Sequence, residues 1–271
     1  MSPHLQQQAL CIEAAGQRLH GVRLLPARTA PNAPTLLFLH EGLGSIGQWR
    51  DFPAALCRRT GLPGLVYDRW GYGRSAPLTG PRPDDYLEQE ARHSLPELLA
   101  ACAIRTPPIL FGHSDGASIA LLFAAFWPEQ VRAVISEAAH INVEEMCLAG
   151  IRRAGHAYAG NGLRAALQRY HDDNTEGMFY GWHDTWLRPT RRTWSMTAHL
   201  PRITCLTLII QGAEDEYGSR AQVDAIAAGV AGPAEILWLP GCRHVPHQQA
   251  RDVVLDTVVR FIDGLGINRY P

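Results

Sequence analysis

The stretch ILFGHSDGASIA, residues 109–120, joins a short apolar run to a helical pattern through two glycines and a serine. Gly112, Ser114 and Gly116 fit G-x-S-x-G, directly after a predicted strand and directly before a predicted helix, which is the context this motif requires. A turn this sharp crowds the residues two before and two after the serine, so small residues there keep its hydroxyl exposed. We therefore interpret Ser114 as a nucleophile; the alternative is an ordinary phosphate-binding or packing turn.

Short apolar runs alternate with longer helical patterns along the chain. This alternation predicts an α/β fold with a mostly parallel, twisted sheet of about eight strands flanked by helices. Apolar residues at spacings of three and four predict the helices. The predicted strands lie at 35–40, 64–70, 108–114, 131–139, 205–212 and 234–241, after a hairpin over 11–26; the predicted helices lie at 49–59, 85–103, 117–127, 220–230 and 248–265.

The segment between Ala139 and Cys205 is too long for a simple crossover, since connections in α/β units usually take a few residues. It contains helical patterns and the aromatic-rich stretch MFYGWHDTW, residues 178–186. We interpret residues 140–200 as a helical lid inserted over the carboxyl edge of the sheet. Residues 1–139 and 201–271 then form the core.

A serine hydroxyl needs a histidine to take its proton and an acid to hold that histidine in the right tautomer. Asp215 follows the predicted strand at 205–212, and His244 follows the next one. Carboxyl ends of parallel strands meet at one edge of a sheet, where ligands bind. We expect Asp215 to orient His244; Glu214 and Glu216 are alternative acids, and His247 is more simply a packing or capping residue.

The tetrahedral intermediate of acyl transfer also needs donors for its oxyanion, which are usually backbone N–H groups. The stretch LHEGLGS, residues 39–45, follows the predicted strand at 35–40. We assign the oxyanion hole to the amides of Gly42 and Asp115.

These motifs together resemble the α/β-hydrolase superfamily over essentially the whole chain. The order Ser, Asp, His is that of its triad. YDRWGYGRS, residues 67–75, resembles the family's D-x-x-G-x-G-x-S stretch, and HEGLGS, residues 40–45, resembles its HG-x-x-x-S oxyanion loop. The resemblance implies a helix-flanked sheet and a serine-dependent hydrolase without metal or organic cofactor, but the superfamily spans many reactions.

One position departs from the family pattern, because Glu41 stands where the family usually has glycine after the loop histidine. The simpler interpretation turns its carboxylate away, toward Arg69 or a backbone amide; the sharper one lets it face the substrate. In the amino-acid ester hydrolases that the chain resembles, an aspartate at the position of Asp115 binds the substrate's ammonium group. Asp115, together with Glu41, would then favour cationic or hydrogen-bond-donating substrates; alternatively the Asp115 carboxylate only bonds neighbouring backbone.

Aromatic side chains of the predicted lid are further candidates for substrate contact, because they suit flat or apolar groups at a site entrance. More often such residues pack a lid onto its domain. Besides Glu41, we name His113, Trp182 and Trp186 as substrate-binding candidates.

Composition excludes several other chemistries. The chain has no lysine, so Schiff-base catalysis, a pyridoxal phosphate anchor and a Walker A loop are excluded. A formal net charge of −1 argues against nucleic acid as a partner. The six cysteines show no zinc spacing, and no apolar run approaches the roughly 20 residues that span a bilayer. With no signal-peptide pattern at the start, we expect a cytoplasmic monomer or homodimer that binds a small-molecule substrate and no membrane.

The expected activity is cleavage of a small or medium carboxylic ester or thioester through an acyl-enzyme. Two alternatives stay open: a C–C bond hydrolase or cofactor-free oxygenase on the same fold, and a non-catalytic binding protein that keeps the pocket.

Overall fold

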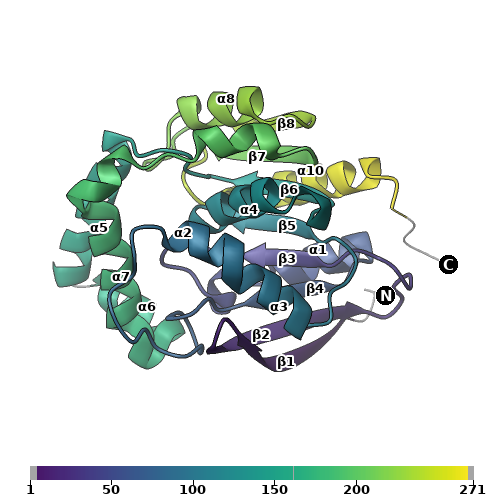
Figure 1. Cartoon of the computed structure of the whole chain (residues 1–271), viewed down its shortest axis with the longest axis horizontal. Coiled ribbons are helices and arrows are strands. Elements are labelled where there is room, and N and C mark those ends of the chain that lie inside the picture. The colour runs from purple at the N-terminus through teal and green to yellow at the C-terminus, as the bar shows by residue number, and fades with distance from the viewer. Residues whose placement is uncertain (1–4, 161, 268–271) are drawn as a thin grey trace.

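The computed structural model describes residues 5–160 and 162–267, in which one eight-stranded sheet carries the site (Figure 1). The strand order is β1-β2-β4-β3-β5-β6-β7-β8. β1 and β2 form an antiparallel hairpin, β2 pairs antiparallel with β4, and the other pairs are parallel. The predicted mostly parallel α/β sheet is confirmed. The strands are β1 Leu5–Ala14, β2 Gln17–Pro26, β3 Leu36–Leu39, β4 Gly64–Tyr67, β5 Ile109–His113, β6 Ala133–Glu137, β7 Leu206–Gly212 and β8 Ala234–Leu239.

Helices cover both faces of the sheet, because both faces of its central strands are apolar. Along β5, Leu110 packs into one core while Ile109 and Phe111 pack into the other. The first core is closed by α2 Tyr86–Gln89, α3 Leu95–Ala101, α4 Asp115–Phe126 and α8 Arg220–Gly229, and the second by α1 Phe52–Thr60 and α10 Arg251–Gly264. A π-helical turn, Glu90–Ser94, links α2 to α3, and α9 Pro246–Gln249 precedes α10.

The opening hairpin begins at Leu5, six residues before its predicted start at Cys11. Gln6, Gln7 and Gln8 belong to β1 but are exposed. β1 is an edge strand of the sheet, where backbone pairing with β2 extends the strand through residues that have no alternating apolar face.

Three helices lie between β6 and β7: α5 Glu145–Gly160, α6 Gly162–His171 and α7 Thr175–Leu187. Figure 1 shows them grouped beyond one end of the sheet, the end toward which the β3 strand runs. α7 packs into the core through Met178, Phe179 and Trp186. Short 3-10 turns complete the chain at Ile46–Trp49, Pro128–Gln130, Asp172–Asn174, Pro189–Thr193 and Thr197–Arg202.

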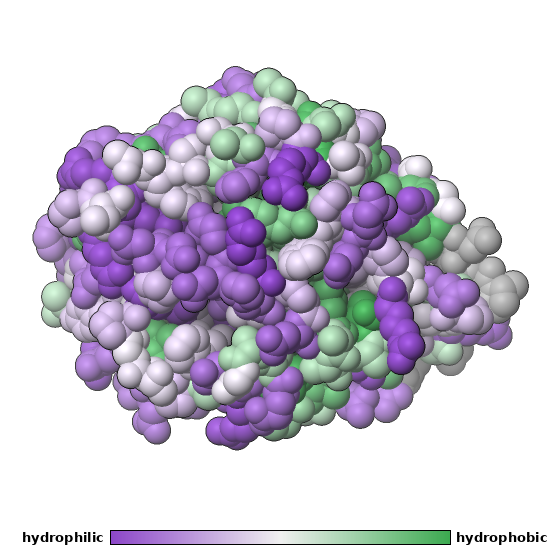
Figure 2. All heavy atoms as spheres, in the orientation of Figure 1, coloured by the Kyte–Doolittle hydropathy of each residue, from purple (hydrophilic) through white to green (hydrophobic). Residues whose placement is uncertain are grey.

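Hydrophilic and hydrophobic residues are interspersed on the face seen in Figure 2, and hydrophilic ones dominate toward the side where α5 to α7 lie. Four exposed large hydrophobic residues lie on four different elements: Tyr170, Tyr180, Ile236 and Val253. Within the described ranges, none of the helices combines the length and apolar character needed to cross a bilayer.

Candidate active site

Ser114 occupies a sharp turn between β5 and α4. Its φ of 53° and ψ of −117° lie in a region that residues with a side chain rarely adopt. A Cβ on Gly112 would come within 2.2 Å of the Gly116 carbonyl oxygen, and one on Gly116 within 1.9 Å of the Leu39 carbonyl oxygen. The crowding inferred from the motif is therefore real, and it places the Ser114 hydroxyl at the carboxyl edge of the sheet.

Gly116→Ala is expected to lower the free energy of unfolding by about 3 kcal/mol, at the upper end of the usual cost of overpacking. The added methyl would collide with backbone, which cannot rotate away as a flexible side chain can. Urea denaturation followed by circular dichroism measures the change. Gly177→Ala is the matched control, because nothing lies within 4 Å of its Cβ position and alanine in α7 should stabilise the helix. Equal stabilities for the two variants would contradict the crowding argument.

The three predicted triad residues meet although 130 positions separate Ser114 from His244. The Ser114 hydroxyl donates to His244 Nε2 at 3.1 Å. His244 Nδ1 donates to the two Asp215 oxygens at 2.9 and 2.8 Å. With its ring proton on Nδ1, His244 carries no proton on Nε2 and can accept the proton of the Ser114 hydroxyl.

The Asp215 carboxylate accepts further hydrogen bonds besides those from His244. The backbone N–H of Tyr217 donates to Oδ1 at 2.8 Å, and the Gln211 amide donates to Oδ2 at 2.6 Å. Burial alone would raise the pKa of Asp215, but His244 and the Tyr217 amide outweigh it and lower the pKa. Glu214 is exposed and Glu216 pairs with Arg243 at 3.0 Å, so the geometry favours Asp215 over both alternative acids.

Gly42 and Asp115, whose amides we assigned to the oxyanion hole, line the same cavity as Ser114. Asp115 begins α4, so its amide has no acceptor within the helix. Gly42 lies under the Trp182 indole, since a Cβ there would come within 2.2 Å of Trp182 Nε1. Glycine at 42 therefore lets Trp182 of α7 pack closely against the loop over residues 40–45.

The loop that carries Gly42 is pinned through one carbonyl. The Glu41 carbonyl accepts hydrogen bonds from His40 Nδ1 at 2.8 Å, Arg69 Nη2 at 2.9 Å and the Gly44 amide at 3.1 Å. The Asp68 carboxylate accepts from the Ile46 amide at 2.8 Å, just beyond the loop. Arg69 and Asp68, both in the stretch YDRWGYGRS, thus hold the loop that carries Gly42 in place.

The Glu41 carboxylate bonds His113 and not Arg69, one of the two partners that its simpler interpretation expects. Its Oε2 lies 3.2 Å from His113 Nδ1, and the carboxylate packs against Gly44, which has no side chain to block it. Burial opposes the charge of Glu41, but His113 outweighs burial and keeps the pKa of Glu41 well below its usual value. Glu41 lines the cavity with its side chain 23% exposed, so a carboxylate faces the site.

The Asp115 carboxylate bonds side chains, not the neighbouring backbone. Its Oδ2 accepts from the Tyr86 hydroxyl at 2.5 Å, and its Oδ1 accepts from Trp186 Nε1 at 3.3 Å. Arg69, fully buried, lies 3.8 Å away and supplies the balancing charge. Both oxygens of Asp115 are therefore engaged within the protein.

Of the aromatic residues in the lid, Trp182 and Trp186 line the cavity, whereas others serve packing. Phe179 stacks on Tyr158, and Trp194 Nε1 donates to Glu88 at 2.7 Å. Trp186 combines both roles because it also anchors Asp115.

Several cavity residues were not predicted from the sequence. His140 lies three residues after the end of β6, and its ring lies 6.1 Å from the His244 ring. Burial and the charge of His244 lower the pKa of His140 to about 4, so it is neutral. Its position just after a parallel strand could have revealed it. The other unpredicted lining residues are Leu43, Gln48, Cys147, Ile151, Leu163, Leu167, Glu216, Tyr217 and Val245.

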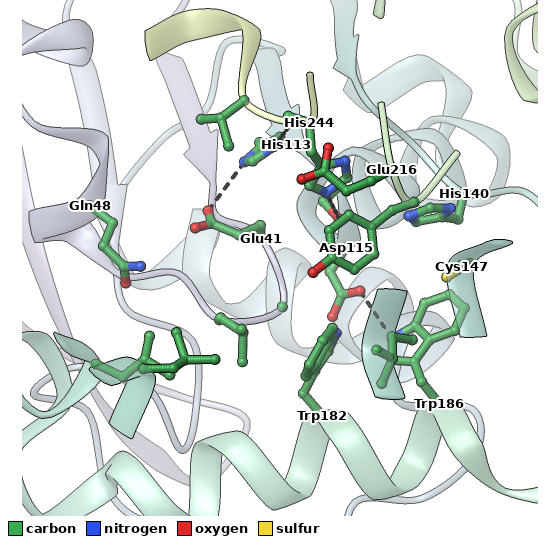
Figure 3. Close-up of a pocket in the computed structure, with 18 residues that line it drawn as sticks. Glu41, Gln48, His113, Asp115, His140, Cys147, Trp182, Trp186, Glu216 and His244 are labelled. Atoms are coloured by element: carbon green, nitrogen blue, oxygen red, sulfur yellow. Dashed lines mark hydrogen bonds and ion pairs between the residues drawn. The ribbon is translucent and has the colours of Figure 1, made fainter. Parts of the chain in front are cut away.

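The cavity encloses about 300 Å³ between the sheet edge and α5 to α7 (Figure 3). Four apolar side chains of α5, α6 and α7 line it: Ile151, Leu163, Leu167 and Trp182. Glu41, Ser114 and His244 line the same cavity, and Figure 3 shows Glu41 beside His113. The arrangement can activate a hydroxyl against a carbonyl in a partly apolar space.

The fold and the hydrogen-bonded side chains of Ser114, Asp215 and His244 together define a hydrolase built on an eight-stranded α/β sheet. The chain belongs to the alpha/beta hydrolase family, whose model matches residues 36–257.

Known proteins of this fold resemble the chain over nearly its full length. Human serine hydrolase BPHL is 26% identical over 249 residues, covering 89% of this chain and 83% of BPHL. The structure of a proline iminopeptidase from Mycobacterium smegmatis superimposes with a TM-score of 0.74 at 18% identity, over 95% of this chain and 98% of the other. A Thermogutta terrifontis esterase gives 0.69 at 17% identity, over 95% and 99%.

Proposed function

We propose that this hydrolase cleaves a small or medium carboxylic ester or thioester through an acyl-enzyme on Ser114. The observation that carries the proposal is the series of hydrogen bonds from Ser114 through His244 to Asp215. Ser114 and His244 line the cavity. The name of the relative BPHL, a serine hydrolase, supports the same chemistry.

The mechanism has two acyl-transfer steps. His244 Nε2 takes the Ser114 proton as Oγ attacks the substrate carbonyl, and the amides of Gly42 and Asp115 receive the oxyanion. His244 then gives its proton to the leaving group. Water, activated by the same nitrogen, attacks the acyl-enzyme and releases the acid. Asp215 keeps Nδ1 protonated throughout and stabilises the charge on His244.

Cavity size and its apolar wall support the substrate size we propose. A space of about 300 Å³ is at the lower end of ordinary ligand sites. The lid wall fits an apolar or flat group of the acyl or alcohol part. Active-site labelling with a fluorophosphonate probe tests the nucleophile: we expect one adduct, on the peptide that contains Ser114, and an unlabelled protein would overturn the proposal.

One buried acceptor supports a narrower substrate class. Three carboxylates line the cavity, from Glu41, Asp115 and Glu216, and each has a basic partner within the described chain, so the support comes from the carboxylate oxygens that these partners leave unbonded. Glu216 Oε2 is buried without a hydrogen-bond partner in the described chain. Unpaired buried acceptors are costly, so a donor from the substrate would satisfy it. We extend the proposal to esters that carry a cation or a hydrogen-bond donor.

Three esters of one alcohol, differing only in an α-ammonium, neutral or carboxylate group on the acyl chain, measure this preference. We expect kcat/KM to fall by about tenfold or more from the cationic to the anionic ester, because ion pairs in a partly buried site are weakly screened. Glu41→Gln and Glu216→Gln should reduce the ratio. Glu214→Gln, an exposed neighbour, is the control. Equal rates for all three esters would remove the charge preference and leave ester cleavage in place.

A further inference from the structure

His113 lies between two loops of the site. It ends β5, directly before Ser114, and its side chain is fully buried. Its Nδ1 lies 3.2 Å from Glu41 Oε2, in the oxyanion loop. Its Nε2 lies 2.8 Å from the backbone carbonyl oxygen of His244. One ring therefore contacts the loop that carries the oxyanion amide and the residue that carries the base.

The two contacts require a doubly protonated ring. An ionised carboxylate and a peptide carbonyl only accept hydrogen bonds, and a neutral imidazole has one N–H to donate. Both contacts can be made together only by the imidazolium. Burial works against the charge, but the hydrogen bond to Glu41 and its charge outweigh burial and raise the pKa of His113 to about 9.

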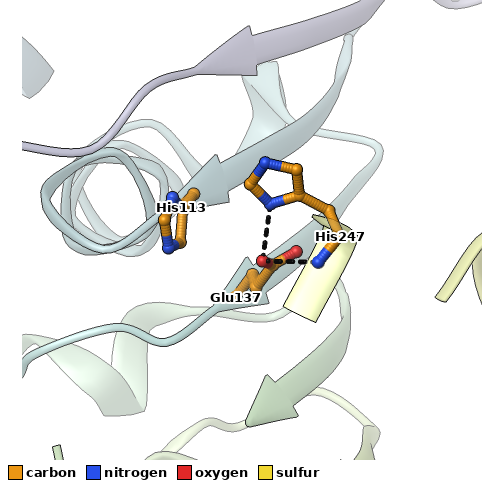
Figure 4. Close-up of side chains that lie close together, drawn as sticks. All are labelled: His113, Glu137 and His247. Carbon is orange, nitrogen blue, oxygen red and sulfur yellow. Dashed lines mark hydrogen bonds and ion pairs between the residues drawn. The ribbon is translucent and has the colours of Figure 1, made fainter. Parts of the chain in front are cut away.

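A second ion pair lies behind the ring (Figure 4). Glu137, at the end of β6, accepts from the backbone N–H of His247 at 3.1 Å and from His247 Nδ1 at 2.7 Å. His113, Glu137 and His247 each offer one atom that could ligate a metal ion, and these three atoms lie within 4.8 Å of one another. Both ring nitrogens of His113 are already engaged, so the cluster fits a charge network better than a metal site. The Glu137 carboxylate also favours the imidazolium.

We propose that His113 is a positioning residue that, as an imidazolium, clamps the oxyanion loop through Glu41 and the catalytic histidine through the His244 carbonyl. The clamp rests on the proposed function, because it sets the separation of Gly42 and His244 around Ser114. It also explains the unusual Glu41: glycine there would leave one His113 N–H without its carboxylate partner. Small displacements matter at such a site, since an error of about 1 Å can cost about 100-fold in rate.

The charge of the clamp sets its pH range. The groups that face His113 are Glu41, Glu137, His244 and His247, from three separate segments. Because the pKa of His113 is raised to about 9, the ring keeps both protons and both contacts at neutral pH, and the contacts are lost as pH rises through about 9. The wild type should therefore lose kcat above pH 9.

The test compares His113→Asn, Glu41→Gln and the double variant, with His156→Asn, an exposed histidine on α5, as control. For a neutral ester we expect each single variant to lower kcat by about tenfold or more while KM changes less than about twofold. The double variant should be no worse than His113→Asn, because the two residues act as one unit. The alkaline loss of kcat should be absent from His113→Asn.

Nuclear magnetic resonance gives a readout that does not depend on turnover. The ring signals of His113, assigned by their absence from His113→Asn, should titrate near pH 9 in the wild type and well below that in Glu41→Gln. Unchanged kcat in a folded His113→Asn, additive losses in the double variant, or an ordinary titration of His113 would each overturn the clamp. If His113→Asn does not fold, Glu41→Gln and the wild-type titration decide. A wild type that neither labels with fluorophosphonate nor cleaves esters would instead overturn the proposed function, while the titration would still report on the clamp.

Discussion

Replacing Ser114 with alanine is expected to lower kcat for ester hydrolysis by about 10⁵- to 10⁶-fold, because the acyl-enzyme cannot form. The oxyanion donors and cavity stay in place, so weak residual turnover by water remains possible. Steady-state rates with a chromogenic ester measure the loss, and the fluorophosphonate adduct should vanish with it. His244→Ala should cost a similar factor, and the double variant little more, since the two residues act as a unit.

Ser195→Ala is the matched control, because this serine is exposed and its side chain bonds Thr197. It should keep full activity. Turnover that survives in Ser114→Ala would contradict the acyl-enzyme and favour cofactor-free oxygenase chemistry with His244 as the base.

Replacing Asp215 with asparagine is expected to lower kcat by about 10⁴-fold near neutral pH with little change in KM. The asparagine amide would donate to His244 Nδ1 and leave the proton on Nε2, where the ring can no longer accept from Ser114. Because the Gln211 and Tyr217 donors surround the same position, the fold should persist. Rates as a function of pH and circular dichroism check both expectations.

Glu214→Gln separates the assigned acid from its exposed neighbour. It should leave kcat within about twofold, since exposed charges interact weakly. A large loss in this variant, with Asp215→Asn active, would reassign the acid.

Local sequence was sufficient to predict the nucleophile turn. The steric conditions of a strand-to-helix turn involve only the residues two on either side of Ser114, and glycine occupies both positions. Asp215 and His244 could also be predicted, because each follows a recognisable strand and parallel strands place their carboxyl ends at one edge of the sheet. The start of β1 could not be predicted, since its residues Gln6, Gln7 and Gln8 are exposed and show no apolar alternation.

The partners of the charged side chains could not be predicted in the same way. The simpler interpretation of Glu41 expected its carboxylate to bond Arg69 or a backbone amide, yet Arg69 bonds the Glu41 carbonyl and the carboxylate bonds His113. The difference follows from strand order: β3 lies between β4 and β5, so Glu41 has Arg69 on one side and His113 on the other. Which neighbour meets which atom depends on register and side-chain direction across strands.

The amino-acid sequence was enough to predict the side chains of the proposed chemistry: a hydroxyl, a base and an acid, each expected at or just beyond the end of a strand. Tertiary structure alone decided how the charges around them are balanced. Tyr86 and Trp186 reach Asp115 from distant segments, and His113 joins two loops that lie 203 residues apart at Glu41 and His244. Hydrogen bonds and ion pairs act over a few ångströms in space, whatever the separation along the chain, so only the packed sheet and lid bring these partners within reach.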